Sequence, residues 1–248
     1  MKSPNNINTS NTQSNNELET SSVDKLEAKN SARELMEKYG DRIIYTDENG
    51  KETHSILNPW AMQKTALKSP EDMLILGQVF QHMADRWQKH DETGWDEAIK
   101  VDSKSMLGQW IERQNSHQTD EIDTLDKGRP NRRFIVGEYG DRIIYQDENG
   151  NEMKLTLDPL AMIEDSTNSP NDMHNAGVAL VRMANRWHNG ESNPDRLHRP
   201  LGPNGDDVET GWDKALRVDS KSSLGSWIAR NNKKTEDILK SNVDTEYV

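Results

Sequence analysis

The stretch from Glu92 to Ile111 reads ETGWDEAIKVDSKSMLGQWI, and it returns at Glu209 to Ile228 as ETGWDKALRVDSKSSLGSWI with 15 of 20 positions identical. A second pair precedes it: YGDRIIYTDENGKE at 39–52 and YGDRIIYQDENGNE at 139–152 are identical at 12 of 14 positions. Such self-similarity indicates a tandem duplication. We therefore expect an α+β protein of two homologous units, each a β-hairpin packed on three to four helices.

The limits of the two copies predict the domain organisation. Residues 1–22 are rich in Asn, Ser and Thr and poor in apolar side chains, so a disordered tail is expected. The second copy carries an insertion of 17 residues, dense in Pro, Gly and Asn, which predicts a loop over 189–207. In chain order we expect a first unit, a linker, a second unit and a C-terminal tail, over 23–122, 123–132, 133–240 and 241–248.

Composition restricts the classes of function. The formal net charge of −12 repels phosphate backbones, so nucleic-acid binding is not expected. The absence of cysteine excludes disulfides, thiolate metal sites and a cysteine nucleophile. No apolar run approaches the ~20 residues that cross a bilayer, and no secretory leader is recognisable. We expect no membrane contact, and either a cytoplasmic location or export from a bacterium by a leaderless specialised route.

A long amphipathic helix is predicted in each unit, beginning at Ser69-Pro70 and at Ser169-Pro170, because serine caps a helix start and proline suits its first turn. Gly77 and Gly177 stand inside these helices, where glycine costs about 1 kcal/mol relative to alanine; a close helix crossing would explain them. The apolar stripe of the first helix repeats at spacings of three and four and consists of Met73, Leu76, Phe80, Met83 and Trp87.

The two units are expected to bury surface against each other. Only 31% of the residues are apolar, and small units bury a smaller fraction of their surface than large domains do. An intramolecular pseudo-dimer would supply the missing apolar contact.

Shorter elements are predicted from local signals. The pairs Asn49-Gly50 and Asn149-Gly150 favour hairpin turns, because both residue types tolerate positive φ. Trp95, Ala98 and Ile99 fit one face of a short helix, and Asp102 or Ser103 could cap a second helix after it. The segment NRRFIVGEYG at 131–140 is compatible with either helix or strand.

The tetrapeptide D-S-K-S is identical in the two copies, while the stretch over 58–79 diverges from its counterpart. Three interpretations stay open: a helix cap, a small anion site at a helix start, or a protein-contact surface formed twice. The candidate anion-binding residues are Ser103, Lys104, Ser105, Ser220, Lys221 and Ser222.

An enzyme signature is not recognisable. No histidine is shared between the copies, so a duplicated histidine acid, base or metal site is not expected. No phosphate-binding glycine loop or nucleophile motif occurs. We therefore assign no catalytic residue, metal ligand or cofactor. The alternative hypothesis is an enzyme with an acidic active site in the cleft between the repeats.

The leading hypothesis is a non-enzymatic protein-interaction module, such as a bacterial effector or inhibitor that binds a partner protein of unknown identity. Trp95 and Trp212 each follow a glycine and are expected to be partly exposed; tryptophan and arginine are the residue types that most often anchor interfaces. The arginines shared between the copies are expected to pair with nearby acids such as Asp41, Glu48 or Asp96; they are Arg42 and Arg142, Arg86 and Arg186, and Arg113 and Arg230. The inserted loop adds three candidate partner-binding residues, Arg196, His198 and Arg199.

Overall fold

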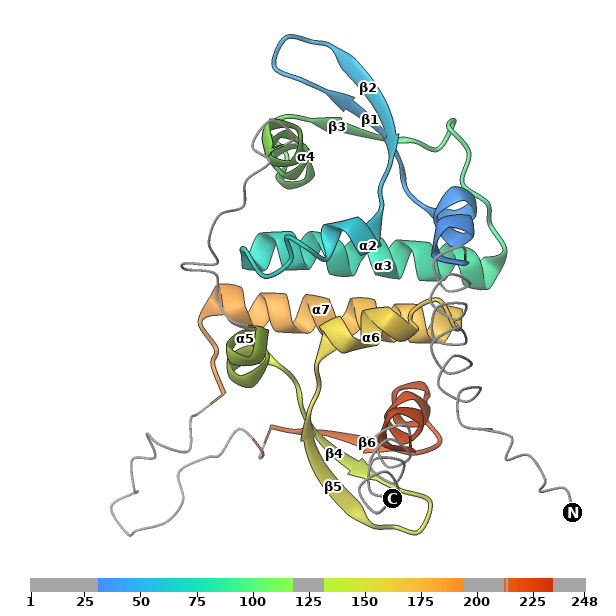
Figure 1. Cartoon of the computed structure of the whole chain (residues 1–248), viewed down its shortest axis with the longest axis vertical. Coiled ribbons are helices and arrows are strands. Elements are labelled where there is room, and N and C mark those ends of the chain that lie inside the picture. Colours follow the sequence, from blue (N-terminus) through green and yellow to red (C-terminus); the bar gives the residue numbers. More distant parts are fainter. Residues whose placement is uncertain (1–30, 118–131, 194–211, 213, 234–248) are drawn as a thin grey trace, which may run out of the picture.

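The computed structural model describes residues 31–117, 132–193, 212 and 214–233, and it combines helices with two three-stranded sheets (Figure 1). The predicted α+β class is confirmed. Two similar strand–helix units follow each other along the chain, which suggests the tandem duplication. Both tails and most of the linker and of the inserted loop lie outside the described residues, so the predicted domain boundaries stay predictions.

The two units repeat one order of elements. After a helix over 31–39, the first unit contains β1 (Arg42–Thr46), β2 (Glu52–Ile56), α2 (Pro59–Met62), α3 (Pro70–Lys89), β3 (Ile99–Asp102) and α4 (Met106–His117). The second contains α5 (Arg132–Tyr139), β4 (Arg142–Gln146), β5 (Glu152–Thr156), α6 (Pro159–Asp165), α7 (Pro170–Asn189), β6 (Leu216–Asp219) and a helix described over 223–233. The segment left open between helix and strand is therefore helical, as α5.

Each sheet consists of the predicted hairpin and a third strand that the sequence analysis missed. The strand orders are β2-β1-β3 and β5-β4-β6. The hairpin strands are antiparallel, whereas β3 pairs parallel with β1 and places Val101 opposite Tyr45. The short helix predicted at 95–99 is wrong. Ile99 and Val101 alternate with Lys100 and Asp102, which is the two-residue period of a strand, and only Val101 among them is buried.

The hairpin turns form where predicted, but with different chemistry. Gly50 and Gly150 adopt positive φ, 77° and 84°, whereas the preceding asparagines do not. In the first turn the Asp47 carboxylate accepts hydrogen bonds from the N–H groups of Asn49 and Lys51, each at 2.9 Å. The aspartate side chain therefore stabilises the turn through hydrogen bonds to its backbone. Positive φ was expected at both Asn and Gly, but only the glycine adopts it.

The long helices α3 and α7 lie side by side in the middle of the molecule, with the sheets toward its two ends (Figure 1). A Cβ atom on Gly77 would lie 2.9 Å from the carbonyl oxygen of Gly177, and one on Gly177 would lie 2.8 Å from that of Gly77. The predicted close helix crossing is therefore confirmed. The predicted stripe is buried as well: Met73, Leu76, Phe80 and Met83 are fully enclosed, and Trp87 packs against them.

Two kinds of ion pair fix the other elements to the long helices. Asp41, just before β1, is 2% exposed and pairs with Arg86 near the end of α3; Asp141 and Arg186 repeat this pair. Arg113 pairs with Asp72 at the start of α3, and Arg230 pairs with Asp172 in the same way. The expectation that shared arginines pair with acids is confirmed at these four positions.

The Asp41 pair has a titratable third member. His82 Nδ1 lies 3.5 Å from Asp41 Oδ2; at the matching place in the second unit, Arg182 Nε lies 3.0 Å from Asp141 Oδ2. The hydrogen bond to Asp41 raises the pKa of His82 above 6.5, more than burial and Arg86 lower it. Burial alone would raise the pKa of Asp41, but hydrogen bonds from His82 and Arg86 bring it below its ordinary value.

Within the described ranges, no helix is both long and apolar enough to pass through a bilayer.

Adding a methyl group at the crossing should destabilise the protein. Gly77→Ala and Gly177→Ala should each lower the free energy of unfolding by about 1–3 kcal/mol, the range for overpacking, because the methyl group overlaps the backbone of the other helix. Urea unfolding followed by circular dichroism measures this. Gly137→Ala is the matched control, because a Cβ on this helical glycine meets nothing within 4 Å. An equal loss at all three positions would contradict the close crossing.

The stability of the first unit should depend on pH through His82. A raised pKa in the folded state means that the stabilisation is fully present below the unfolded value of 6.5 and is lost as pH rises through the folded pKa. His82→Arg copies the second unit and keeps its charge. Between about pH 6 and about pH 8.5 the melting temperature of the wild type should therefore fall relative to that of His82→Arg. Parallel profiles would show that the His82–Asp41 contact contributes nothing.

Candidate functional site

The outer face of each sheet is the surface turned away from the core. Side chains alternate along a strand, and Ile43 and Tyr45 of β1 are buried at 0% and 3% exposure. Their neighbours Arg42 and Ile44 therefore belong to the opposite face, and the strand register places His54 of β2 beside Ile44.

Trp95 covers this outer face in the first unit. Its ring centroid lies 5.3 Å from that of His54, and the guanidinium carbon of Arg42 lies 5.9 Å from the centre of the Trp95 ring. The distance to Arg42 is that of a cation–π contact. Although His54 and Arg42 contact the ring, the Trp95 residue is 47% exposed. We call Trp95, Arg42 and His54 the Trp95 face.

The Arg42 side chain is held rigidly. It is 8% exposed, and its guanidinium donates to the carbonyl oxygens of Met36 at 3.5 Å, of Gly40 at 3.0 Å and of Glu37. These carbonyls lie at the C-terminal end of the helix over 31–39, where a cation is favoured by the helix dipole. The cation beneath Trp95 is thus fixed by the backbone of a neighbouring element.

The second unit repeats the arrangement with different details. The guanidinium carbon of Arg142 and the Nζ of Lys154 each lie 5.6 Å from the ring of Trp212, which is partly buried. Arg142 donates to the carbonyl oxygen of Gly137 at 3.0 Å and to the hydroxyl of Thr156. We call Trp212, Arg142 and Lys154 the Trp212 face.

Both faces carry basic side chains on an acidic protein. The register adds Lys100 to the outer face of the first sheet and Arg217 to that of the second, each opposite an isoleucine of the central strand. Arg217 also pairs with Glu152 at 2.8 Å. Each face thus joins a tryptophan to basic groups, while the whole chain carries a formal charge of −12.

Sequence reasoning selected Trp95 and Trp212 but missed what lies beneath them. Arg42 was expected to pair with an acid; instead it contacts backbone carbonyls and the Trp95 ring. Arg142 likewise contacts a backbone carbonyl and the Trp212 ring, and its expected pairing with an acid stays a prediction. The available signal was the arginine retained at the start of both hairpins, but no spacing rule connects it to a tryptophan more than fifty positions away in the chain. Arg196, His198 and Arg199 lie outside the described residues.

The D-S-K-S turn links β3 to α4 through hydrogen bonds of its own. Asp102 Oδ1 accepts from the N–H groups of Lys104 at 2.8 Å and Ser105 at 3.0 Å. The Ser105 hydroxyl accepts from the N–H of Gly108 at 3.0 Å and donates to the Asp102 carbonyl. The residue that caps α4 is therefore Ser105, and the prediction of Asp102 or Ser103 as the cap is wrong. Ser222 and Gly225 repeat the contact at 3.0 Å.

A glycine completes this turn. A Cβ atom on Gly108 would lie 1.9 Å from the Asp102 carbonyl oxygen, and one on Gly225 would lie 2.0 Å from that of Asp219. The shared D-S-K-S-x-x-G sequence therefore has a structural reason. The N–H groups of Lys104 and Ser105 are already bonded inside the turn, so an anion would have to rely on Lys104 and its counterpart Lys221. Anion binding there stays a prediction.

The parts of the chain that the structure describes hold no cluster of three or more His, Asp or Glu side chains suited to a metal ion. Comparisons with protein-family models, with curated proteins and with solved structures give no match to this chain. Proposals about its function therefore rest on the geometry of the two faces.

Removing the capping hydroxyl should destabilise the protein. Ser105→Ala and Ser222→Ala should each lower the free energy of unfolding by about 1 kcal/mol, because a helix N–H group loses its acceptor. Chemical denaturation measures the change, and Ser103→Ala is the control inside the same turn. If Ser103→Ala costs as much as Ser105→Ala, the cap has been assigned to the wrong residue.

Proposed function

We propose that the chain is a non-enzymatic protein-interaction module that presents the Trp95 face and the Trp212 face to a partner protein. One observation carries the proposal. The exposed Trp95 lies over Arg42, whose guanidinium donates to backbone carbonyls, and the partly buried Trp212 lies over Arg142 in a similar way.

The residue types in the two faces, and the ordering of their side chains before a partner binds, support this role. Tryptophan and arginine account for a large share of interface hot spots. Side chains that are ordered before binding lose less entropy when a partner arrives, and Arg42 is already fixed by three carbonyl oxygens. Charged groups beside each tryptophan would orient the partner, since complementary charge speeds encounter and sets orientation.

The module would hold its two faces in a fixed relation as an intramolecular pseudo-dimer. Contacts between α3 and α7 support this. His188 of α7 lies 3.2 Å from Glu71 of α3, and His174 of α7 lies 3.6 Å from Asp85 of α3. Both acids belong to the first unit and both histidines to the second.

The equivalent positions with the two units exchanged lack these residue types. Gln88 stands where the second unit has His188, and Asn171 stands where the first unit has Glu71. Likewise, Leu74 corresponds to His174, and Asn185 corresponds to Asp85. Two first units placed together would therefore oppose glutamate to glutamine and aspartate to leucine. These two contacts therefore form between unlike units and could not form between like ones.

Site-specific photo-crosslinking tests the interaction. A photoreactive phenylalanine derivative at position 95, or at position 212, should capture the same protein from lysates of the organism that makes this chain. The control is position 134, where Phe134 is 58% exposed on α5 and outside both faces. Equal capture at position 134 would show that the crosslinks are unspecific.

Affinity then tests the role of the tryptophans. With the captured protein purified, Trp95→Ala and Trp212→Ala should each weaken binding by about tenfold or more, as hot-spot residues do. Circular dichroism must first show that both variants fold. Unchanged affinity in the folded double variant would overturn the proposal.

A further inference from the structure

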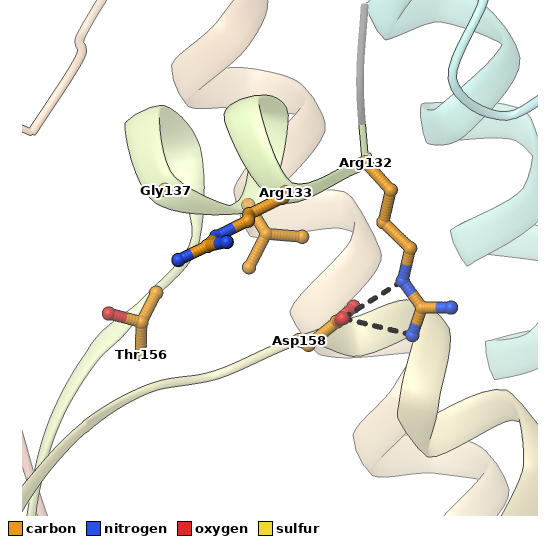
Figure 2. A pocket seen from close by; sticks show the side chains of 6 residues that line it. Arg132, Arg133, Gly137, Thr156 and Asp158 are labelled. Carbon is orange, nitrogen blue, oxygen red and sulfur yellow. Dashed lines mark hydrogen bonds and ion pairs between the residues drawn. The ribbon is translucent and has the colours of Figure 1, made fainter.

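Two pockets of the second unit differ in whether their polar groups already have partners. Figure 2 shows the pocket between α5 and the start of α6, where Nε and Nη2 of Arg132 each lie 2.9 Å from Asp158 Oδ2. The charge of this arginine is therefore used within the chain. The other pocket, of about 520 Å³, is formed by the β4–β5 hairpin and the helix over 223–233. Its volume lies within the range of small-molecule sites, roughly 300–1,000 Å³.

A buried tyrosine lines this hairpin pocket. Tyr145 of β4 is 5% exposed, and within the described residues its hydroxyl has no hydrogen-bond partner. Burial, followed by the charges of Asp147, Glu148 and Asp219, raises the pKa of this hydroxyl, and no hydrogen bond contributes to the shift. A buried polar group without a partner costs free energy. A ligand that supplies an acceptor would remove this cost.

The first unit shows which group fits beside this hydroxyl. There the equivalent Tyr45 is 3% exposed and donates a hydrogen bond to Glu112 Oε1 at 2.7 Å. In the second unit the position of Glu112 is occupied by Ala229, whose side chain ends at Cβ and brings no acceptor. Ala229 is exposed and lines the pocket. A carboxylate is therefore the group that the second unit lacks at this place.

Two further exchanges change the walls of the pocket. Met153 of β5, which is 38% exposed, stands where the first unit has Thr53. Lys233 stands in the last helix where the first unit has Ser116. Both Met153 and Lys233 line the pocket. Compared with the first unit, this place has thus lost one acid and gained an apolar side chain and a cation.

The acids that line the pocket are already engaged. Asp147 accepts three hydrogen bonds, at 2.8–2.9 Å, from residues of its own hairpin turn. Glu152 pairs with Arg217 at 2.8 Å. Lys233, by contrast, forms no ion pair in the part of the chain that the structure describes. Its charge can therefore be shared with an anionic ligand.

We propose that the hairpin pocket binds a short aliphatic carboxylate, whose carboxylate group accepts a hydrogen bond from Tyr145 as the glutamate of the first unit does internally. A hydrogen bond to an ionised acceptor is stronger than one between neutral groups. Lys233 adds a favourable charge, and the apolar body of the ligand lies against Met153 and Ala229. This inference does not depend on the interaction proposed for the tryptophan faces.

Titration of the full chain with butyrate, followed by the NMR signals of the tyrosine rings, tests the proposal. Butyrate should shift the Tyr145 signals in a saturable way. Butyramide keeps the shape but lacks the charge, and butylamine carries the opposite charge; both should bind about tenfold more weakly or not detectably. Absence of a saturable shift with butyrate would overturn the proposal. Equal binding of butyramide or butylamine would also overturn it, because the pocket would then not recognise a carboxylate.

Two substitutions test the position of the ligand, with the backbone amide signal of Met153 as the measure of binding. Tyr145→Phe keeps the ring and removes a hydroxyl without a partner, so it should fold and bind butyrate about tenfold more weakly. Tyr45→Phe, the same change in the first unit, should leave the affinity unchanged. Ala229→Glu supplies the internal carboxylate of the first unit at an exposed position and should abolish binding. Unchanged affinity in Tyr145→Phe or Ala229→Glu would place butyrate elsewhere and overturn the assignment.

Discussion

The contact between α3 and α7 at Gly77 and Gly177 is the constraint on which the rest of the molecule depends. A unit of this size and composition has little apolar surface to bury. Phe80 of α3 and Leu180 of α7 belong to one cluster of buried apolar residues. A side chain at either glycine would meet the backbone of the other helix. The two sheets lie on opposite sides of this helix pair (Figure 1).

A chain of polar contacts connects the crossing to the outer faces. A buried carboxylate is costly unless it is paired, so Asp41 fixes the start of β1 against Arg86 of α3. The next residue is Arg42, which the backbone carbonyls hold beneath Trp95. Asp141 and Arg142 stand in the same relation in the second unit. The position of each tryptophan is therefore tied to the long helices through two consecutive residues.

The sequence was sufficient where the signal was local. Serine caps, helical periodicity and paired glycines predicted α3 and α7 and their crossing, and the Asn-Gly pairs predicted both hairpins. Prediction from the sequence failed where an element packs against a segment that is distant in the chain. The strand β3 pairs with β1 across more than fifty residues, and three apolar residues with helical spacing outweighed the alternation of Ile99 and Val101.

The differences between the units bear on how the module could work. Where His54 stacks on Trp95 as an aromatic ring, Lys154 approaches Trp212 as a cation. Where His82 approaches Asp41, Arg182 approaches Asp141. Each exchange puts a lysine or an arginine of the second unit where the first unit has a histidine. Under the proposed function, two faces that share a tryptophan and an arginine but differ in the residue beside the ring would suit a partner that is itself asymmetric.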